Sequence, residues 1–238
     1  MYFKSIASFV DGLCAVKRLI FDEKRYTLSE FAEILAANWE GYEPLRLEIR
    51  RFPEKYGNGN AVADMLAKEF AEFVAGISNN KPNGRGGVFK AALFSIHDCF
   101  THGKVTGATP EGRFAGEPLS KNLCADFGMD KNGITALISS VTKIDHSDFP
   151  TGSVLDFVIH PSAISGDEGL NAFKGLVDTY FKRGGFALHG NVFDADTLRD
   201  AQKHPEKYGN LQVRVCGWNA YFTNLPKEQQ DAFIAQAL

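Results

Sequence analysis

The stretch that most constrains the fold is a short alternating run close to the end of the sequence. Apolar side chains occupy every second position from Leu211 to Val215, which is the period of a half-buried strand. Successive strand residues point to opposite faces, so Arg214 and Cys216 are expected to share the face away from the core. Gly217 then interrupts the strand. A glycine at this place indicates a turn with unusual dihedral angles or a close backbone approach.

The hundred residues that end the chain alternate between strand and helix patterns. Strand patterns lie at 154–160 and 187–193, and helical patterns lie at 169–183 and 198–204. This rhythm is typical of crossover connections between parallel strands. We therefore predict an α/β fold, with a last helix over 226–238.

The first third of the chain predicts helices. Apolar residues recur at helical spacing over 6–21 and 62–77. Thr27 and Glu30 have the spacing of a capping box, which predicts a helix that starts after Thr27 and ends at Gly41. These residues carry little that suggests chemistry, so this third is interpreted as scaffold.

A glycine-rich segment follows at 84–118. Its turn sequences, Thr109–Arg113 and Ala115–Leu119, indicate an ordered loop. The loop has no Gly-Lys-Ser/Thr ending and no following helix start, which argues against a phosphate-binding loop. Arg113 is a candidate for pairing with a carboxylate elsewhere.

The run around Gly217 resembles the C-terminal signature of the glycyl radical enzymes, which include pyruvate formate-lyase and several dehydratases. That signature reads Arg-Val-small-Gly-Tyr. Arg214, Val215 and Gly217 match it, Cys216 fills the small position, and Trp218 stands where tyrosine is usual.

The resemblance extends over almost the whole chain, because Thr109–Arg113, Ala115–Leu119, residues 17–28 and Asn191 also match the family. It implies an α/β fold, namely the C-terminal part of a ten-stranded barrel with helices packed outside. Residues 1–118 would then form the helical scaffold and loop portion, and residues 119–238 the glycine radical domain.

The resemblance also implies a role for each matched residue. Gly217 would store a backbone radical: loss of one α-hydrogen leaves a planar carbon, which a β-carbon would crowd. No bound cofactor or metal is implied, because a radical S-adenosylmethionine activase with a [4Fe-4S] cluster would install the radical. Trp218 and Tyr221 could form an apolar wall around the α-carbon, with core packing of these aromatics as the equal alternative. The residues expected to be recognised by the activase are Arg214, Val215 and Trp218. The residues expected to support the loop or site are Arg113, Asn191 and Cys216.

The family's thiyl-forming cysteine has no counterpart here. No Cys-Cys or Cys-x-Glu pair occurs, and the four cysteines are far apart. We therefore expect the radical-bearing C-terminal part of a formate C-acetyltransferase-like lyase or dehydratase, inactive by itself. The alternatives are a non-catalytic radical subunit that docks on a cysteine-bearing partner, and a remnant without a radical. Because Trp218 and Gly190 depart from the patterns of both reaction types, the reaction stays open.

Composition excludes other classes. The net charge is −3, with 26 basic and 29 acidic residues interspersed, which argues against nucleic-acid binding. No apolar run has the length of a membrane span, and the spread cysteines indicate a reduced, cytoplasmic chain. No fourth ligand is evident near His97, Cys99 and His102, so we interpret them as a buried cysteine and two hydrogen-bonded histidines and not as a zinc site. The expected partners are the activase and the missing N-terminal part or a cysteine-bearing chain, with a homodimer when complete, in oxygen-sensitive anaerobic metabolism.

Overall fold

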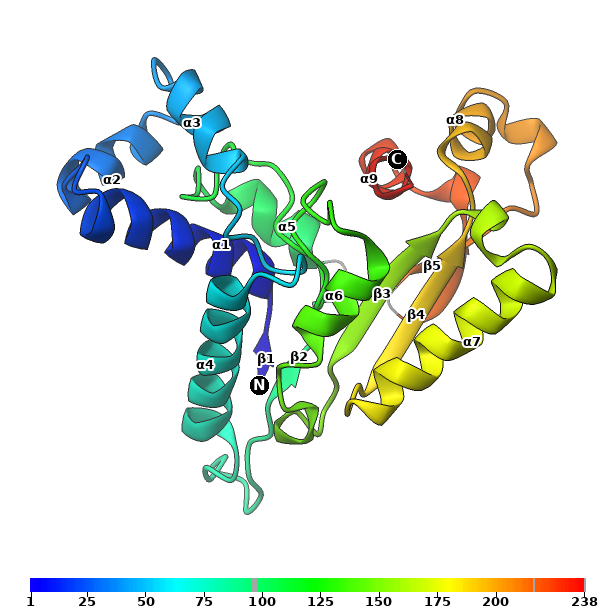
Figure 1. Ribbon diagram of the computed structural model, residues 1–238, viewed down its shortest axis with the longest axis horizontal. Coiled ribbons are helices and arrows are strands. Elements are labelled where there is room, and N and C mark those ends of the chain that lie inside the picture. The colour runs from blue at the N-terminus through cyan, green and yellow to red at the C-terminus, as the bar shows by residue number, and fades with distance from the viewer. Residues whose placement is uncertain (96–97, 216, 238) are drawn as a thin grey trace. The chain divides into compact units, whose positions relative to one another are not determined.

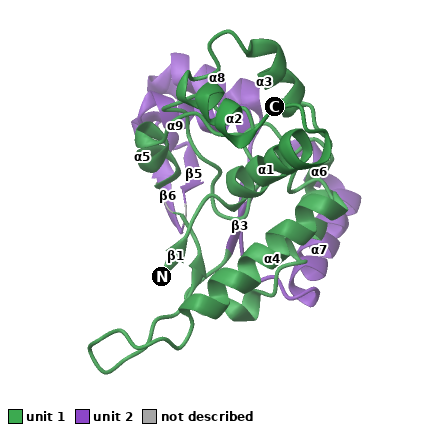
Figure 2. Cartoon of the chain, turned by 90° about the vertical axis from the view of Figure 1, so that its left-hand side faces the viewer, with its two compact units in different colours: residues 1–153 green, residues 154–238 purple. Residues whose placement is uncertain are grey.

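The structure is a computed structural model that describes residues 1–95, 98–215 and 217–237. Two residues named in the sequence analysis, His97 and Cys216, lie outside the described residues. The chain divides into two compact units, residues 1–153 and residues 154–238 (Figure 2).

The first unit is mainly helical, as the sequence predicts. α1 spans Ile6–Val16 and continues into a π-helical segment at Lys17–Asp22. The other helices are α2 (Leu28–Ala36), α3 (Glu43–Arg50), α4 (Ala61–Ser78), α5 (Asp98–Val105) and α6 (Gly133–Val141). α1 packs on α4, with the rings of Phe9 and Phe70 centred 4.4 Å apart. None of the helices among the described residues has the length and apolar character needed to cross a membrane.

The predicted capping box at the start of α2 is confirmed. The hydroxyl of Thr27 accepts a hydrogen bond from the Glu30 backbone, and the Glu30 carboxylate accepts one from the Thr27 backbone at 2.8 Å. The predicted end at Gly41 is wrong, because α2 ends at Ala36. Asn38 and Trp39 then take positive φ angles, and the buried Trp39 indole donates to the Arg113 carbonyl at 3.1 Å. A tertiary bond thus holds the chain in a turn before Gly41.

The strands of the first unit are short. β1 (Tyr2–Phe3) pairs in parallel with β2 (Ala92–Leu93), and Leu93 also forms a bridge with Ser153. An apolar core lies under α1, α2 and α3. Its buried members are Ala15, Leu19, Phe31, Ile34, Trp39, Leu45, Ile49 and Phe52.

The second unit contains the predicted strand–helix–strand arrangement. β3 (Val154–Ile159) and β4 (Ala187–Val192) pair in parallel from Val154↔Ala187 to Ile159↔Val192. α7 (Gly166–Lys182) connects them and lies along the pair (Figure 1). The Tyr180 hydroxyl at the end of α7 donates to the Ala187 carbonyl at 3.0 Å, so the helix is bonded to the strand that it precedes.

The rest of the second unit supports a hairpin. α8 (Ala195–Lys203) precedes β5 (Gln212–Val215), which pairs antiparallel with β6 (Trp218–Tyr221), and α9 (Lys227–Gln236) follows. The sequence predicted β5 and the turn but not β6. The buried core that holds this hairpin to α8 and α9 consists of Phe193, Leu198, Ala201, Val213, Val215, Phe222, Phe233 and Ile234.

Candidate functional site at the β5–β6 turn

Gly217 lies at the tip of the β5–β6 hairpin. Val215 pairs with Trp218, so only residues 216 and 217 form the connection. Two-residue hairpin turns favour positive φ angles, and Gly217 has a φ of 104°. A β-carbon built on Gly217 would meet no atom within 4 Å. Backbone conformation, and not crowding, is therefore what favours glycine here.

The hairpin tip is exposed in this chain. Gly217 is exposed, and the Trp218 and Tyr221 side chains are 43% and 44% exposed. The apolar wall that the sequence analysis considered for these two aromatics is therefore not formed by the described residues. The α-carbon of Gly217 is open to whatever approaches the tip from outside.

Asn191 holds the hairpin to β4. Its buried side-chain amide accepts a hydrogen bond from the Arg214 backbone N–H at 2.7 Å and donates one to the Arg214 carbonyl at 3.2 Å. Alternate residues of an antiparallel strand turn their backbone groups to opposite edges, and those of Arg214 face away from β6. The Asn191 side chain thus forms the hydrogen bonds with this edge of β5 that a neighbouring strand would otherwise form. The structure brings together two residues that the sequence analysis selected separately.

Besides Trp218, the residues expected to be recognised by the activase are Arg214 and Val215, and their side chains differ in solvent exposure. The Arg214 guanidinium is partly exposed and donates to the Asn219 side chain at 3.1 Å, across the outer face of the hairpin. Val215 is buried in the core of the second unit. Its side chain can reach a partner only if the hairpin leaves that core.

Gly190 precedes Asn191 in β4 and leaves room for an aromatic ring of the neighbouring strand. It pairs with Phe157 on β3, and a β-carbon on Gly190 would lie 2.5 Å from the Phe157 ring. The ring in turn lies 6.3 Å from that of Phe173 in α7. The small residue at position 190 is therefore matched to an aromatic on the neighbouring strand.

Arg113 belongs to the first unit, where it is buried. Its guanidinium donates to the carbonyls of Glu117, Thr106 and Gly107 and to the hydroxyl of Thr109. Among the described residues it forms an ion pair with Glu111 of the same loop, at 4.0 Å, and the charges of Asp126 and Glu117 also act on it. Burial lowers the pKa of Arg113. Arg113 therefore organises the turn in which it lies.

Three buried carboxyl groups of the first unit were not predicted from the sequence, namely those of Asp11, Glu111 and Asp126. Burial is the main cause that raises the pKa of Asp11 to about 8 and that of Glu111 to about 7, and it also raises the pKa of Asp126. Asp11 lies on the buried face of α1 with Ala7, Val10 and Cys14. The small apolar neighbours at helical spacing around it were the sequence signal that could have indicated its burial. No cluster of three His, Cys, Asp or Glu side chains in the described ranges is placed to hold a metal.

Comparison with known proteins agrees with this arrangement. The family model described as "Glycine radical" matches residues 119–223, and the model described as "Pyruvate formate lyase-like" matches residues 1–103. The chain is 33% identical to the trans-4-hydroxy-L-proline dehydratase of Clostridioides difficile, over 97% of this chain and 29% of that protein. It is 37% identical to the indoleacetate decarboxylase of Tractidigestivibacter scatoligenes, over 95% and 28%.

Solved structures show the same relationship. The glycerol-bound, B12-independent glycerol dehydratase from Clostridium butyricum matches with a TM-score of 0.93 and 38% identity, over 98% of this chain and 30% of that one. A glycyl radical enzyme from Archaeoglobus fulgidus matches with a TM-score of 0.90 and 32% identity, over 100% and 30%. The fold is thus the α/β class of the glycyl radical enzyme barrels, as predicted. The chain belongs to the glycyl radical enzyme family and spans about 30% of the length of these relatives.

Proposed function

We propose that this chain stores an organic radical on the α-carbon of Gly217, as the radical-bearing part of a glycyl radical lyase or dehydratase. The observation that carries the proposal is the position of Gly217. It is an exposed glycine with a φ of 104° at the tip of a hairpin whose base is packed in a core. Membership of the family supports the assignment.

Storage of a radical requires of Gly217 mainly that it has no side chain. The α-carbon loses one hydrogen atom, a proton together with one electron, to a radical S-adenosylmethionine activase. The planar carbon that remains is conjugated with the flanking peptide groups, and no β-carbon crowds it. We assign Arg214, Val215 and Trp218 to recognition by the activase. Asn191 and Arg113 would support the loops, and Cys216, outside the described residues, keeps the same proposed role.

The stored radical then needs a thiol. Gly217 would take back a hydrogen atom from a cysteine and leave a thiyl radical that starts the reaction on the substrate. Cys14 and Cys99 are buried, and burial raises the pKa of Cys14 to about 12, so both suit a structural role. We infer that the reacting cysteine comes from a preceding segment of a longer protein or from a partner chain, and that this chain alone is inactive.

The names of the relatives guide the choice of reaction. Those given above are dehydratases and a decarboxylase, and an isethionate sulfite-lyase of Bilophila wadsworthia is also similar. We propose a lyase or dehydratase reaction in preference to acyl transfer of the formate C-acetyltransferase kind. We further propose a homodimer when complete, an oxygen-sensitive radical and a role in anaerobic metabolism in the cytoplasm.

A second candidate is a radical subunit that docks on a cysteine-bearing partner. The exposed aromatics of β6 favour it, namely Trp218 next to Gly217 and Tyr221 at the other end of the strand, because large exposed aromatics are typical of contact surfaces.

For the domain limits, we propose residues 1–118 as the scaffold and loop portion and residues 119–238 as the radical domain. The range 119–223 that matches the glycine radical model supports a limit at residue 119, whereas the compact units divide after residue 153.

The test is electron paramagnetic resonance of the chain after anaerobic incubation with an activase, S-adenosylmethionine and a reductant. We expect a doublet, because the radical carbon keeps one α-hydrogen, and we expect it to collapse in protein grown on deuterated glycine. Gly217→Ala should show no signal. Gly184→Ala is the matched control, because Gly184 is also exposed with a φ of 94°, and it should keep the signal. A glycyl doublet that persists in Gly217→Ala refutes the assignment.

A further inference from the structure

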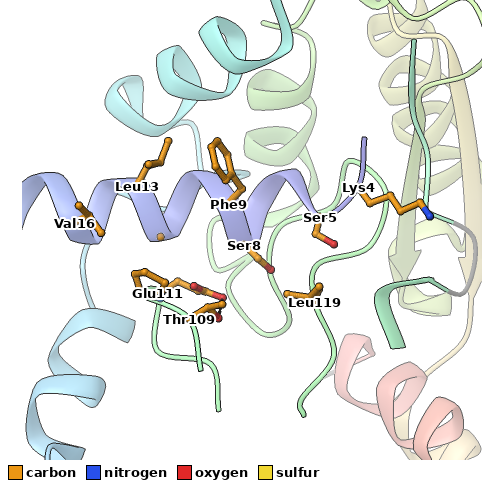
Figure 3. A pocket seen from close by; sticks show the side chains of 11 residues that line it. Lys4, Ser5, Ser8, Phe9, Leu13, Val16, Thr109, Glu111 and Leu119 are labelled. Atoms are coloured by element: carbon orange, nitrogen blue, oxygen red, sulfur yellow. Dashed lines mark hydrogen bonds between the residues drawn. The ribbon is translucent and has the colours of Figure 1, made fainter. Parts of the chain in front are cut away.

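A hairpin of the first unit projects into solvent between α4 and β2 (Figure 1). It comprises residues 80–89, which are all exposed, and a backbone hydrogen bond from the Asn83 N–H to the Gly87 carbonyl at 3.0 Å closes its tip. The cavity beside α1 differs, because its lining is mainly apolar and the Glu111 carboxyl group that Figure 3 shows there is only 1% exposed. Reactions that consume water are therefore favoured at the hairpin over the cavity.

The side chain of Asn83 is bonded to the backbone of the tip. Its Oδ1 accepts hydrogen bonds from the Arg85 N–H at 2.9 Å and from the Gly87 N–H at 3.1 Å. Two N–H donors on one carbonyl oxygen are the arrangement of an oxyanion hole, which stabilises the negative charge that develops on the oxygen when a nucleophile attacks its carbon. The Asn83 side-chain amide is therefore prepared for attack at its carbonyl carbon, Cγ.

The nucleophile is the next residue along the chain. Gly84 has a φ of 76°, and its backbone N–H has no hydrogen-bond partner among the described residues. The Asn83 side-chain nitrogen, which would be the leaving group, has no acceptor in the same part of the structure. Glycine has no β-carbon that could hinder the approach of its nitrogen. The attacking and leaving nitrogens are thus both free to react.

We propose that Asn83 is a site of spontaneous deamidation. The Gly84 nitrogen bonds to Cγ of Asn83 and loses its proton, and the side-chain nitrogen leaves as ammonia, which gives a cyclic succinimide. A water molecule then opens the ring at either carbonyl and yields isoaspartate or aspartate. The net change is the exchange of ammonia for water, without electron transfer. The proposal is independent of the radical chemistry assigned to Gly217.

The chain has two other Asn-Gly pairs, Asn58–Gly59 and Asn132–Gly133, and both are held by bonds within the fold. The Gly59 N–H donates to the Ser140 hydroxyl at 2.9 Å, so the attacking nitrogen of the first pair is engaged. The Asn132 side-chain nitrogen donates to the Asn58 carbonyl at 3.0 Å, so the leaving group of the second pair is engaged. Neither side-chain oxygen accepts two backbone N–H groups from the described residues. We therefore expect deamidation to select Asn83.

The product would carry a carboxylate among basic neighbours. Lys81 and Arg85 belong to the same hairpin, which contains no acidic residue, and neither forms an ion pair within the described ranges. Deamidation adds one negative charge to the chain, so ion-exchange chromatography should separate the modified form from the unmodified one.

Peptide mapping by mass spectrometry tests the selectivity. The full chain is incubated in mildly alkaline heavy-oxygen water, and isoaspartate is confirmed with an isoaspartate-specific methyltransferase. Asn83 should be modified about tenfold faster than Asn58 or Asn132, because only its oxygen has two backbone donors. In guanidinium chloride the three pairs should react at similar rates, since the dipeptide is the same. An unmodified Asn83, or equal rates at the three pairs in the folded chain, would overturn the proposal.

Two variants at one position test the role of the backbone donor. Arg85→Pro removes the N–H that bonds to Oδ1 of Asn83, and it should slow deamidation about three- to tenfold. Arg85→Ala is the matched control, because it removes the guanidinium and keeps the N–H, and its rate should equal that of the unaltered chain. Circular dichroism should show both variants folded. Equal rates in the two variants would refute the assignment of an oxyanion hole at Asn83.

Discussion

The side-chain amide of Asn191 binds both backbone groups of Arg214, at 2.7 Å and 3.2 Å. The amide oxygen accepts and the amide nitrogen donates, as the C=O and N–H of a peptide group would. The Asn191 side chain therefore links β4 to β5 without a further strand. Gly217 lies three residues beyond Arg214. The position of the proposed radical carbon in the second unit therefore depends on this pair and on the core beneath the hairpin.

Asn191→Asp should loosen the hairpin. The carboxylate can still accept from the Arg214 amide, but its second oxygen would face the Arg214 carbonyl without a proton to donate. We expect a loss of about 1–3 kcal/mol in the free energy of unfolding, measured by urea denaturation. Hydrogen exchange of the Arg214 amide should become faster. Asn219→Ala is the control, because Asn219 bonds on the exposed face of the same hairpin, and it should change stability by about 0.5 kcal/mol or less.

Gly217→Ala and Gly184→Ala should lose similar amounts of stability. Both glycines have positive φ angles, 104° and 94°, and neither would place a β-carbon near another atom. The cost in each case is backbone strain of about 1–2 kcal/mol, measured by urea denaturation. Gly217→Ala should therefore remain folded, so that a lost radical signal reports on chemistry. A much larger loss in Gly217→Ala than in Gly184→Ala would show that contacts of the hairpin tip, and not φ alone, require glycine.

Gly190→Ala should destabilise the second unit, whereas Gly175→Ala should stabilise it. The added methyl group at position 190 would meet the Phe157 ring at 2.5 Å, and such overpacking costs about 1–3 kcal/mol. Gly175 lies in the exposed part of α7 with open space around it, and alanine there gains about 1 kcal/mol of helix propensity. Thermal unfolding of the two variants measures both. The double variant Gly190→Ala with Phe157→Leu should recover part of the loss.

The stability of the first unit should fall as the pH rises from about 4 to about 8. The folded pKa of Glu111 is about 7 and that of Asp11 about 8, above their ordinary values of 4.5 and 3.8. Below the ordinary pKa values both carboxyl groups are protonated in the folded and in the unfolded chain, so they remove no stability. Between the two values only the unfolded chain ionises, so each group removes about 1.4 kcal/mol per pH unit. Above the folded pKa the loss stops.

Fluorescence of the buried Trp39 in a Trp218→Phe background reports this transition, since the chain has two tryptophans. Glu111→Gln should make the decline with pH shallower, because glutamine does not titrate in this range. Glu117→Gln should leave the slope unchanged. A profile that rises from acid to neutral pH would contradict the burial of these carboxyl groups.

Much of the fold could be predicted because its signals are local. Helical spacing of apolar residues placed α1 and α4, and the spacing of Thr27 and Glu30 placed the start of α2. Alternation and β-branched residues placed β3 and β5. β6 was missed because the residues after Gly217 carry no clear alternation, and they form a strand only by pairing with β5.

The sequence by itself determined the class of the protein and the candidate carbon, because the order of residues around Gly217 is a covalent property of one short segment. Only the tertiary structure decided that Asn191 meets Arg214, twenty-three residues along the chain, and that Glu111 is buried where the charge of Asp126 acts on it. Such pairs depend on which distant segments the core brings together. Burial and hydrogen-bond geometry are properties of that packing, and no local spacing encodes them.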